Sequence, residues 1–148
     1  MNIDKYALRS EGSFTVFEFI SVGPKGFVHK LVHFQKTNEP GFYNLAFGDK
    51  NHETGELDDL VKTNNGDSEK VLATVVTAVN VFFSKHPEAQ VYATGSTISR
   101  TRLYRKGITK YYNEMVIDFQ LFGRIGDEFH VFEIGKDYTG FLVQRKIP

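Results

Sequence analysis

The residues with the clearest capacity for chemistry lie between positions 95 and 110. Gly95-Ser96-Thr97 follows a short apolar run and precedes a helical pattern that carries Arg100 and Arg102. A strand, a Gly-Ser-Thr turn and a helix N-terminus together receive phosphate or carboxylate groups, because free backbone N–H groups point at the ligand. We therefore predict an anion site formed by Ser96, Thr97, Arg100 and Arg102.

Arg100 has an unusual position on this predicted helix. At about 100° per residue, it falls about 40° from the centre of the apolar face, one turn from the helix start. That face comprises Tyr104, Ile108, Tyr111 and Met115. Because a guanidinium stays charged in a protein, one that is directed inward must find an anion, either a ligand or an internal carboxylate.

An acidic segment offers the internal partner. Residues 49–69 carry seven acids against two lysines, whereas residues 100–110 carry five bases and no acid. Opposite charges in one neutral domain attract each other, and structural ion-pair networks gather charges in this way. We favour this structural interpretation over the ligand site. The candidate acids are Asp49, Asp58, Asp59 and Asp67.

Other patterns exclude several kinds of site. The absence of cysteine excludes disulfides, thiolate metal sites and thiol nucleophiles. The segment that starts at Asp49 resembles a calcium loop, but Thr54 stands where glycine is needed and Leu60 where a bidentate Glu is needed. His29 and His33 lie about 13 Å apart along a strand, too far to bind one zinc ion as a pair. We expect no metal and no cofactor, and no established catalytic motif occurs.

The predicted elements place the 95–110 segment in an α+β fold. Apolar alternation predicts strands at 13–21 and 27–36, joined as a hairpin by the turn Gly23-Pro24-Lys25-Gly26, and further strands at 42–47 and 90–94. Helical spacing predicts one helix from 67 to before Pro87 and a second from 97 to about 115. Further strands are expected at 118–122, 128–134 and 141–145. The order βββ-α-β-α-βββ predicts two helices on one face of a mainly antiparallel sheet.

The stretch 48–66 shows little periodicity and is long for a structureless connection. We expect a functional loop there, with a short helical turn around Leu57, Leu60 and Val61.

Composition limits the class of protein. The chain has 148 residues, 18 Lys+Arg against 18 Asp+Glu, and 21 Phe and Tyr, which predicts a single domain over residues 1–148 with a large core. Zero net charge argues against a duplex-DNA binder, whose basic surplus supplies affinity. Because there is no signal sequence and no apolar run of membrane-spanning length, we expect a cytoplasmic protein that does not bind a membrane.

Several strings of residues carry a resemblance. They are NLAFGD at 44–49, Asp58-Asp59, NNGD at 64–67, VLATV at 71–75 and, most specific, GSTISRTRLYR at 95–105. With these strings, the chain resembles a bacterial family of small uncharacterised proteins, a domain of unknown function. The resemblance covers nearly the whole chain and implies that the charged turn and the acidic loop belong to a recurring design. It implies no activity, cofactor or catalytic residue.

These observations favour a small binding or interaction module without enzymatic activity, whose partner is a protein or a small anionic ligand. The alternative is a metal-independent hydrolase or ribonuclease, toxin-like, in which Arg100 and Arg102 hold phosphate and a histidine or acid is the general base. That alternative requires such a base beside an anion at Ser96. Single-stranded nucleic acid on exposed aromatic residues ranks last, because most Phe residues are expected in the core.

Overall fold

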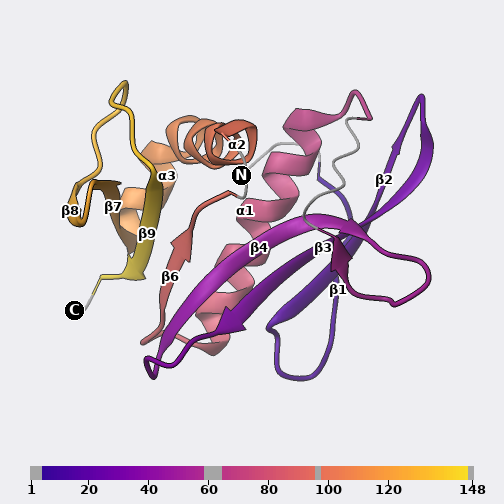
Figure 1. Cartoon of the computed structure of the whole chain (residues 1–148), viewed down its shortest axis with the longest axis horizontal. Coiled ribbons are helices and arrows are strands. Elements are labelled where there is room, and N and C mark those ends of the chain that lie inside the picture. Colours follow the sequence, from indigo (N-terminus) through magenta and orange to yellow (C-terminus); the bar gives the residue numbers. More distant parts are fainter. Residues whose placement is uncertain (1–4, 59–64, 96–97, 147–148) are drawn as a thin grey trace. The chain divides into compact units, whose positions relative to one another are not determined.

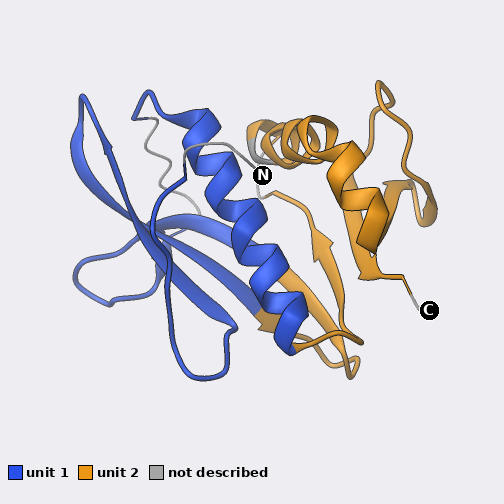
Figure 2. Ribbon diagram, turned by 180° about the vertical axis from the view of Figure 1, so that it is seen from behind, with its two compact units in different colours: residues 1–34, 46–85 blue, residues 35–45, 86–148 orange. Residues whose placement is uncertain are grey.

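The computed structural model describes residues 5–58, 65–95 and 98–146 (Figure 1). Within them, three helices accompany nine strands of a mostly antiparallel sheet, which confirms the predicted α+β class. The chain divides into two compact units, one formed by residues 1–34 and 46–85 and the other by residues 35–45 and 86–148 (Figure 2). The described part of the chain has no helix with both the length and the apolar character needed to cross a membrane.

The first unit is built on the predicted hairpin. β1 (Arg9–Ser10), β2 (Val16–Gly23) and β3 (Gly26–Lys36) pair in antiparallel fashion, with Gly23 opposite Gly26 at the turn. Gly26 has a φ of 87°, in the left-handed region that favours glycine. The turn chemistry of the Gly-Pro-Lys-Gly sequence therefore fixes the register of the hairpin.

α1 (Ser68–Lys85) covers this hairpin and confirms the first predicted helix. Its apolar face buries Phe82 and Phe83 at 0% and 1% exposure. The rings of Phe34 and Phe82 stack with centroids 4.2 Å apart. An aromatic pair of this kind contributes about 0.5–1.5 kcal/mol beyond its burial, so the contact helps to hold the helix on the strands.

The stretch predicted as an irregular loop is partly strand. β4 (Phe42–Lys50) continues past residue 47, and β5 (Leu57–Asp58) folds back on it with Leu57 opposite Lys50. The prediction of a helical turn at Leu57 was wrong, because its backbone groups pair with β4 instead. Leu60 and Val61 lie outside the described residues.

The second unit is a sheet with the strand order β4-β6-β9-β7-β8, of which β4 contributes residues 42–45. β6 (Gln90–Ala93) is parallel to β4, and β9 (Gly140–Arg145), β7 (Phe119–Ile125) and β8 (Glu128–Val131) follow in antiparallel pairs. These bounds confirm the strands predicted in the C-terminal third. One face of the sheet is buried through residues such as Val91, Leu121 and Phe141.

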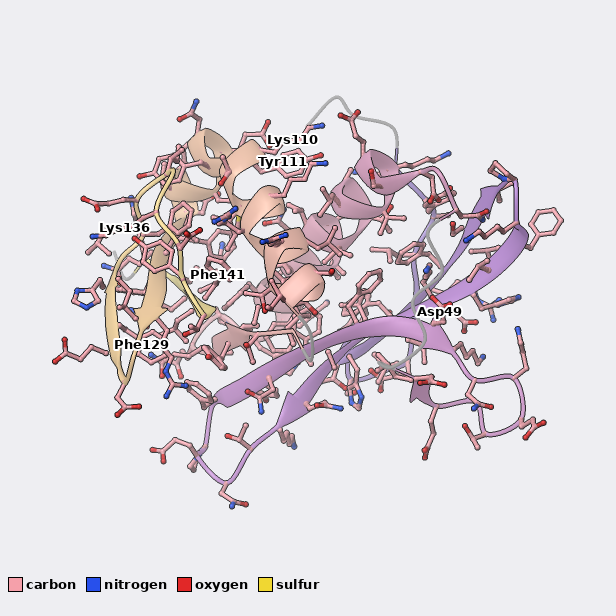
Figure 3. The ribbon with its side chains drawn as sticks, turned by 45° about the horizontal axis from the view of Figure 1, so that its top comes forward. Asp49, Lys110, Tyr111, Phe129, Lys136 and Phe141 are labelled. Atoms are coloured by element: carbon pink, nitrogen blue, oxygen red, sulfur yellow. The ribbon has the colours of Figure 1, made fainter. Side chains whose placement is uncertain are left out.

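Two helices occupy the segment predicted as one. α2 (Ile98–Lys110) and α3 (Tyr112–Asp118) are separated at Tyr111, whose φ of −105° and ψ of 17° leave the helical region. Tyr111, labelled in Figure 3, is only 2% exposed. The predicted inward face is confirmed by the burial of Tyr104, Ile108, Tyr111 and Met115.

Candidate functional site

A pocket of about 520 Å³ lies in the second unit, where β6 leads into α2. We call it the junction pocket. Ser96 and Thr97 lie outside the described residues, and so does the side chain of Arg100 in the first turn of α2. Arg102 is the predicted site residue that lines the pocket. The lining residues are Thr94, Gly95, Ile98, Thr101, Arg102, Arg105, Asp137, Tyr138 and Thr139.

Hydrogen bonds join the three segments that form the junction pocket. The Gly95 N–H donates to Thr101 Oγ1 at 3.1 Å, which ties the end of β6 to the first turn of α2. The Thr94 hydroxyl donates to the Thr139 carbonyl at 2.9 Å, and the Thr139 N–H donates to the Arg124 carbonyl at 2.9 Å. The pocket walls are therefore held by the ends of β6, β7 and β9, not by loops alone.

Two arginines give the junction pocket its positive charge. Arg102 and Arg105 are three residues apart on α2 and so lie on neighbouring positions of one helix face. Arg105 forms an ion pair with Asp137, and their side chains are 36% and 94% exposed. Arg102 is exposed and has no ion-pair partner among the described residues. Because an exposed pair is weak, an incoming anion can compete with Asp137 for Arg105.

The hydrolase alternative requires a base beside this pocket. Asp137 is the one carboxylate among the described lining residues, and none of them is a histidine. In the second unit, His86 lies against the Tyr43 ring with centroids 6.0 Å apart, and His130 lies 3.5 Å from Glu128. Asp137 is thus the base that the described pocket offers.

Asp49, predicted as an acidic partner of the basic helix, has a partner inside the first unit. Its carboxylate lies 2.5 Å from the Lys30 ammonium, and the two residues are 6% and 5% exposed. Such a buried pair must remain intact, because a charge left alone there would be costly. Asp58 lies opposite Asp49 on β5, and Asp59 lies outside the described residues.

Asp67 is part of a half-buried contact in the first unit. Its carboxylate accepts hydrogen bonds from the Ser21 hydroxyl at 2.6 Å and from the Tyr6 hydroxyl at 2.5 Å. Burial, together with the bond to Asp67, raises the pKa of Tyr6. These contacts indicate that Asp67 helps to stabilise the first unit.

Asn65, two residues earlier, was not singled out from the sequence. It is 2% exposed, accepts a hydrogen bond from the Lys25 N–H at 2.7 Å and donates one to the Gly26 carbonyl at 2.9 Å. A Cβ at Gly23 would lie 2.0 Å from the Asn65 carbonyl oxygen, so glycine is required there. The only sequence signal for this role was the NNGD string, which does not indicate a partner.

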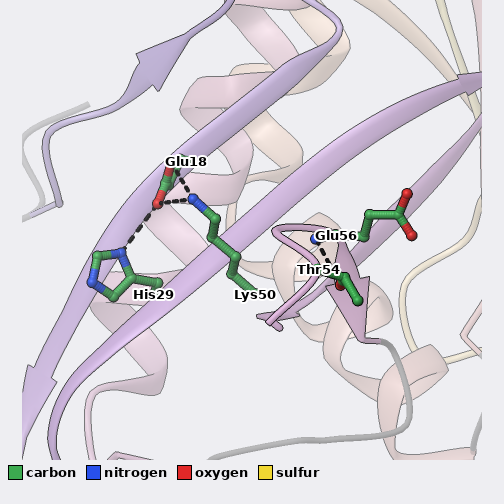
Figure 4. A network of polar contacts seen from close by, with 5 residues as sticks. All are labelled: Glu18, His29, Lys50, Thr54 and Glu56. Carbon is green, nitrogen blue, oxygen red and sulfur yellow. Dashed lines mark hydrogen bonds and ion pairs between the residues drawn. The ribbon is translucent and has the colours of Figure 1, made fainter. Parts of the chain in front are cut away.

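A polar cluster lies on the strands of the first unit (Figure 4). Glu18 lies 3.1 Å from His29 Nδ1 and accepts hydrogen bonds from Lys50 Nζ at 3.2 and 3.4 Å. Although burial opposes it, these contacts lower the pKa of Glu18. The His29 ring also meets His52 edge to face at 5.5 Å. Among the residues described, no group of three or more His, Asp or Glu side chains could hold a metal ion.

Comparison with known proteins supplies information at the level of a family. A family model described as a family of unknown function (DUF6934) matches residues 2–146. No curated protein and no solved structure matches the chain significantly.

Proposed function

Because the chain belongs to this family of unknown function, we propose its role from its own geometry: a cytoplasmic binding module, without catalytic activity, that takes a small anionic ligand in the junction pocket. The observation that supports it is the presence of two guanidinium groups, those of Arg102 and Arg105, in one pocket of about 520 Å³. Charge-assisted hydrogen bonds from guanidinium groups suit phosphate and carboxylate oxygens.

Three more residues belong to the proposed site. The N–H groups and hydroxyls of Ser96 and Thr97 precede α2, where the helix dipole favours an anion. Arg100 would add a third guanidinium from the first turn of the same helix. Together these groups would bind the charged end of the ligand.

The remaining lining residues of the junction pocket indicate the chemistry of the uncharged end of the ligand. Ile98 and Tyr138 supply apolar wall beside the threonine hydroxyls, and the pocket has the size of sites for small organic molecules. A phosphate monoester or carboxylate with an apolar group would therefore bind more tightly than the inorganic ion.

Isothermal titration with inorganic phosphate and with phenyl phosphate tests this function. We expect Arg102→Ala and Arg105→Ala each to weaken binding about tenfold or more, because a hydrogen bond to a charged group contributes about 1.5–3 kcal/mol. Lys106→Ala is the matched control, since it removes the same charge from an exposed position of α2 that does not line the pocket. Equal weakening in all three variants, or no binding by the wild type, would contradict the proposal.

Catalysis is the second candidate, because Asp137 places a carboxylate beside the arginines. A metal-independent hydrolase or ribonuclease would use Asp137 as general base while the arginines hold phosphate. Incubation with bis-p-nitrophenyl phosphate and with RNA separates the two functions. Turnover that is lost in both Asp137→Asn and Arg102→Ala would replace the binding module with an enzyme.

A further inference from the structure

The sheet of the second unit has two different faces. The register aligns Phe141 with Gly123 and His130 on one face, and Phe129 with Arg124 on the other. Phe141 is 0% exposed, whereas Phe129 is 41% exposed; both are labelled in Figure 3. The face that carries Phe129, which we call the open face, also presents Phe42, Tyr92, Phe122 and Arg124.

Three rings form a row across the open face. The Phe42 and Tyr92 rings are stacked with centroids 6.4 Å apart, and the Tyr92 and Phe129 rings meet edge to face at 5.8 Å. Tyr92 lies over the backbone of β9, because a Cβ at Gly140 would be 2.2 Å from its hydroxyl oxygen. Glycine at this position thus leaves the room that the Tyr92 ring occupies above β9.

The described strand residues of the open face carry a single charge, and it is positive. Among its described strand residues, Arg124 is the one charged side chain, and its guanidinium carbon lies 5.9 Å from the centre of the Tyr92 ring. Arg124 also pairs at 3.4 Å with Asp127, a fully exposed carboxylate in the adjoining turn. Instead of acids, the face carries amides joined by hydrogen bonds of 2.7 Å, those of Gln90, Gln144 and Gln120.

We propose that the open face binds the unpaired bases of a single-stranded nucleic acid. Bases stack on aromatic side chains whatever their sequence, and sheets with exposed rings are one of the ways in which proteins bind single strands. Arg124 is placed to receive a phosphate in exchange for the exposed Asp127, and the described strand residues of the open face include no carboxylate that would repel the backbone. A duplex keeps its bases paired and offers no such stacking.

This inference goes beyond the proposed function and uses different residues. Thr139 lines the junction pocket, while the next residue, Gly140, lies beneath Tyr92. Variants in the pocket and on the open face can therefore be made separately, and failure of one proposal leaves the other intact.

Fluorescence anisotropy with labelled U12 RNA and T12 DNA tests the inference. We expect Phe129→Ala and Tyr92→Leu each to weaken binding of at least one strand about tenfold, and Arg124→Gln to weaken it and reduce its salt dependence. Tyr92→Leu keeps an apolar side chain over Gly140, so loss of binding with intact thermal unfolding reports the lost ring. Phe27→Ala is the matched control, because Phe27 is a 75% exposed phenylalanine of the first unit.

Four results would overturn the inference. They are no binding of either strand, equal affinity for a mononucleotide and the oligonucleotide, loss of binding in Arg102→Ala but not in Phe129→Ala, and a wild-type dimer that Phe129→Ala dissociates. The last would make the open face an interface between two copies. Competition by unlabelled single strand but not by duplex, together with weaker binding in the open-face variants and unchanged binding in Phe27→Ala, would support it.

Discussion

Two ion pairs, one in each unit, lie under opposite conditions. In the first, Lys30 and Asp49 pair at 5% and 6% exposure, and Asp67 is engaged by two hydroxyls. In the second, the Arg105–Asp137 pair is open to water at the junction pocket. A buried charge depends on its partner, whereas an exposed charge can exchange its partner for a ligand. Asp49 therefore depends on Lys30 for stability, whereas Arg105 can exchange Asp137 for an anion.

The largest expected effect is on stability and comes from breaking the buried Lys30–Asp49 pair. Lys30→Met leaves Asp49 buried without a partner and should lower the free energy of unfolding by about 3–5 kcal/mol, measured by urea denaturation. The double variant Lys30→Met/Asp49→Leu should recover most of the loss. Arg105→Met is the control and should change stability by about 1 kcal/mol or less, since its pair is exposed. A loss of unfolding free energy in Lys30→Met as small as that in Arg105→Met would show that the two pairs do not differ in this way.

A smaller effect is expected from the glycine beneath Tyr92. Gly140→Ala places a methyl group against the ring, so it should cost about 1–3 kcal/mol of stability and weaken binding of single strands. Gly12→Ala is the control, because a Cβ there meets nothing within 4 Å. If both glycines tolerate alanine equally in thermal unfolding, Tyr92 does not depend on this space.

Arg100→Ala tests whether Arg100 binds the anionic ligand or pairs with a carboxylate of the protein. If Arg100 binds the ligand, the unliganded protein should keep its stability within about 1 kcal/mol, while titration should show anion binding weakened about tenfold or more. A loss of about 3–5 kcal/mol would instead reveal a buried carboxylate partner and restore the structural interpretation of this residue.

The smallest effect concerns pH and an exposed acid of the first unit. The Ser13 hydroxyl, with the N–H groups of Thr15, Ser13 and Val16, lowers the pKa of Glu11 from 4.5 to about 2. The folded state favours the carboxylate, so this contribution to stability is present above pH 4.5 and is lost as pH falls toward about 2. Glu11→Gln should flatten the pH dependence of thermal unfolding in that window. An unchanged slope would show that these hydrogen bonds do not persist.

Several elements could be predicted from the sequence because they depend on local periodicity. The spacing of apolar residues predicted α1, the β2–β3 hairpin and the inward face of α2, all of which the structure confirms. The return of β5 and the break at Tyr111 could not be predicted in this way. Both depend on hydrogen bonds and packing between residues that the local spacing of apolar side chains does not reveal.

Some residues of the candidate site could also be predicted from the sequence, and others could not. Arg102 could be predicted as a candidate site residue, because a basic helix start after a Gly-Ser-Thr turn is a sequence pattern, and it lines the junction pocket. Asp137 and Thr139 could not, since the strand pairing of β9 with β6 brings them to the pocket from more than 30 residues along the chain.

The amino-acid sequence by itself determined the class of fold, the helix faces and the basic start of α2, because side-chain spacing encodes them locally. Tertiary structure decided which charges are buried and which aromatic residues face outward. Alternation along a strand puts neighbouring residues on opposite faces, but the pairing of distant strands and helices chooses the face that is covered. Phe129 and Phe141 are the same residue type, and only that choice made one of them core and the other surface.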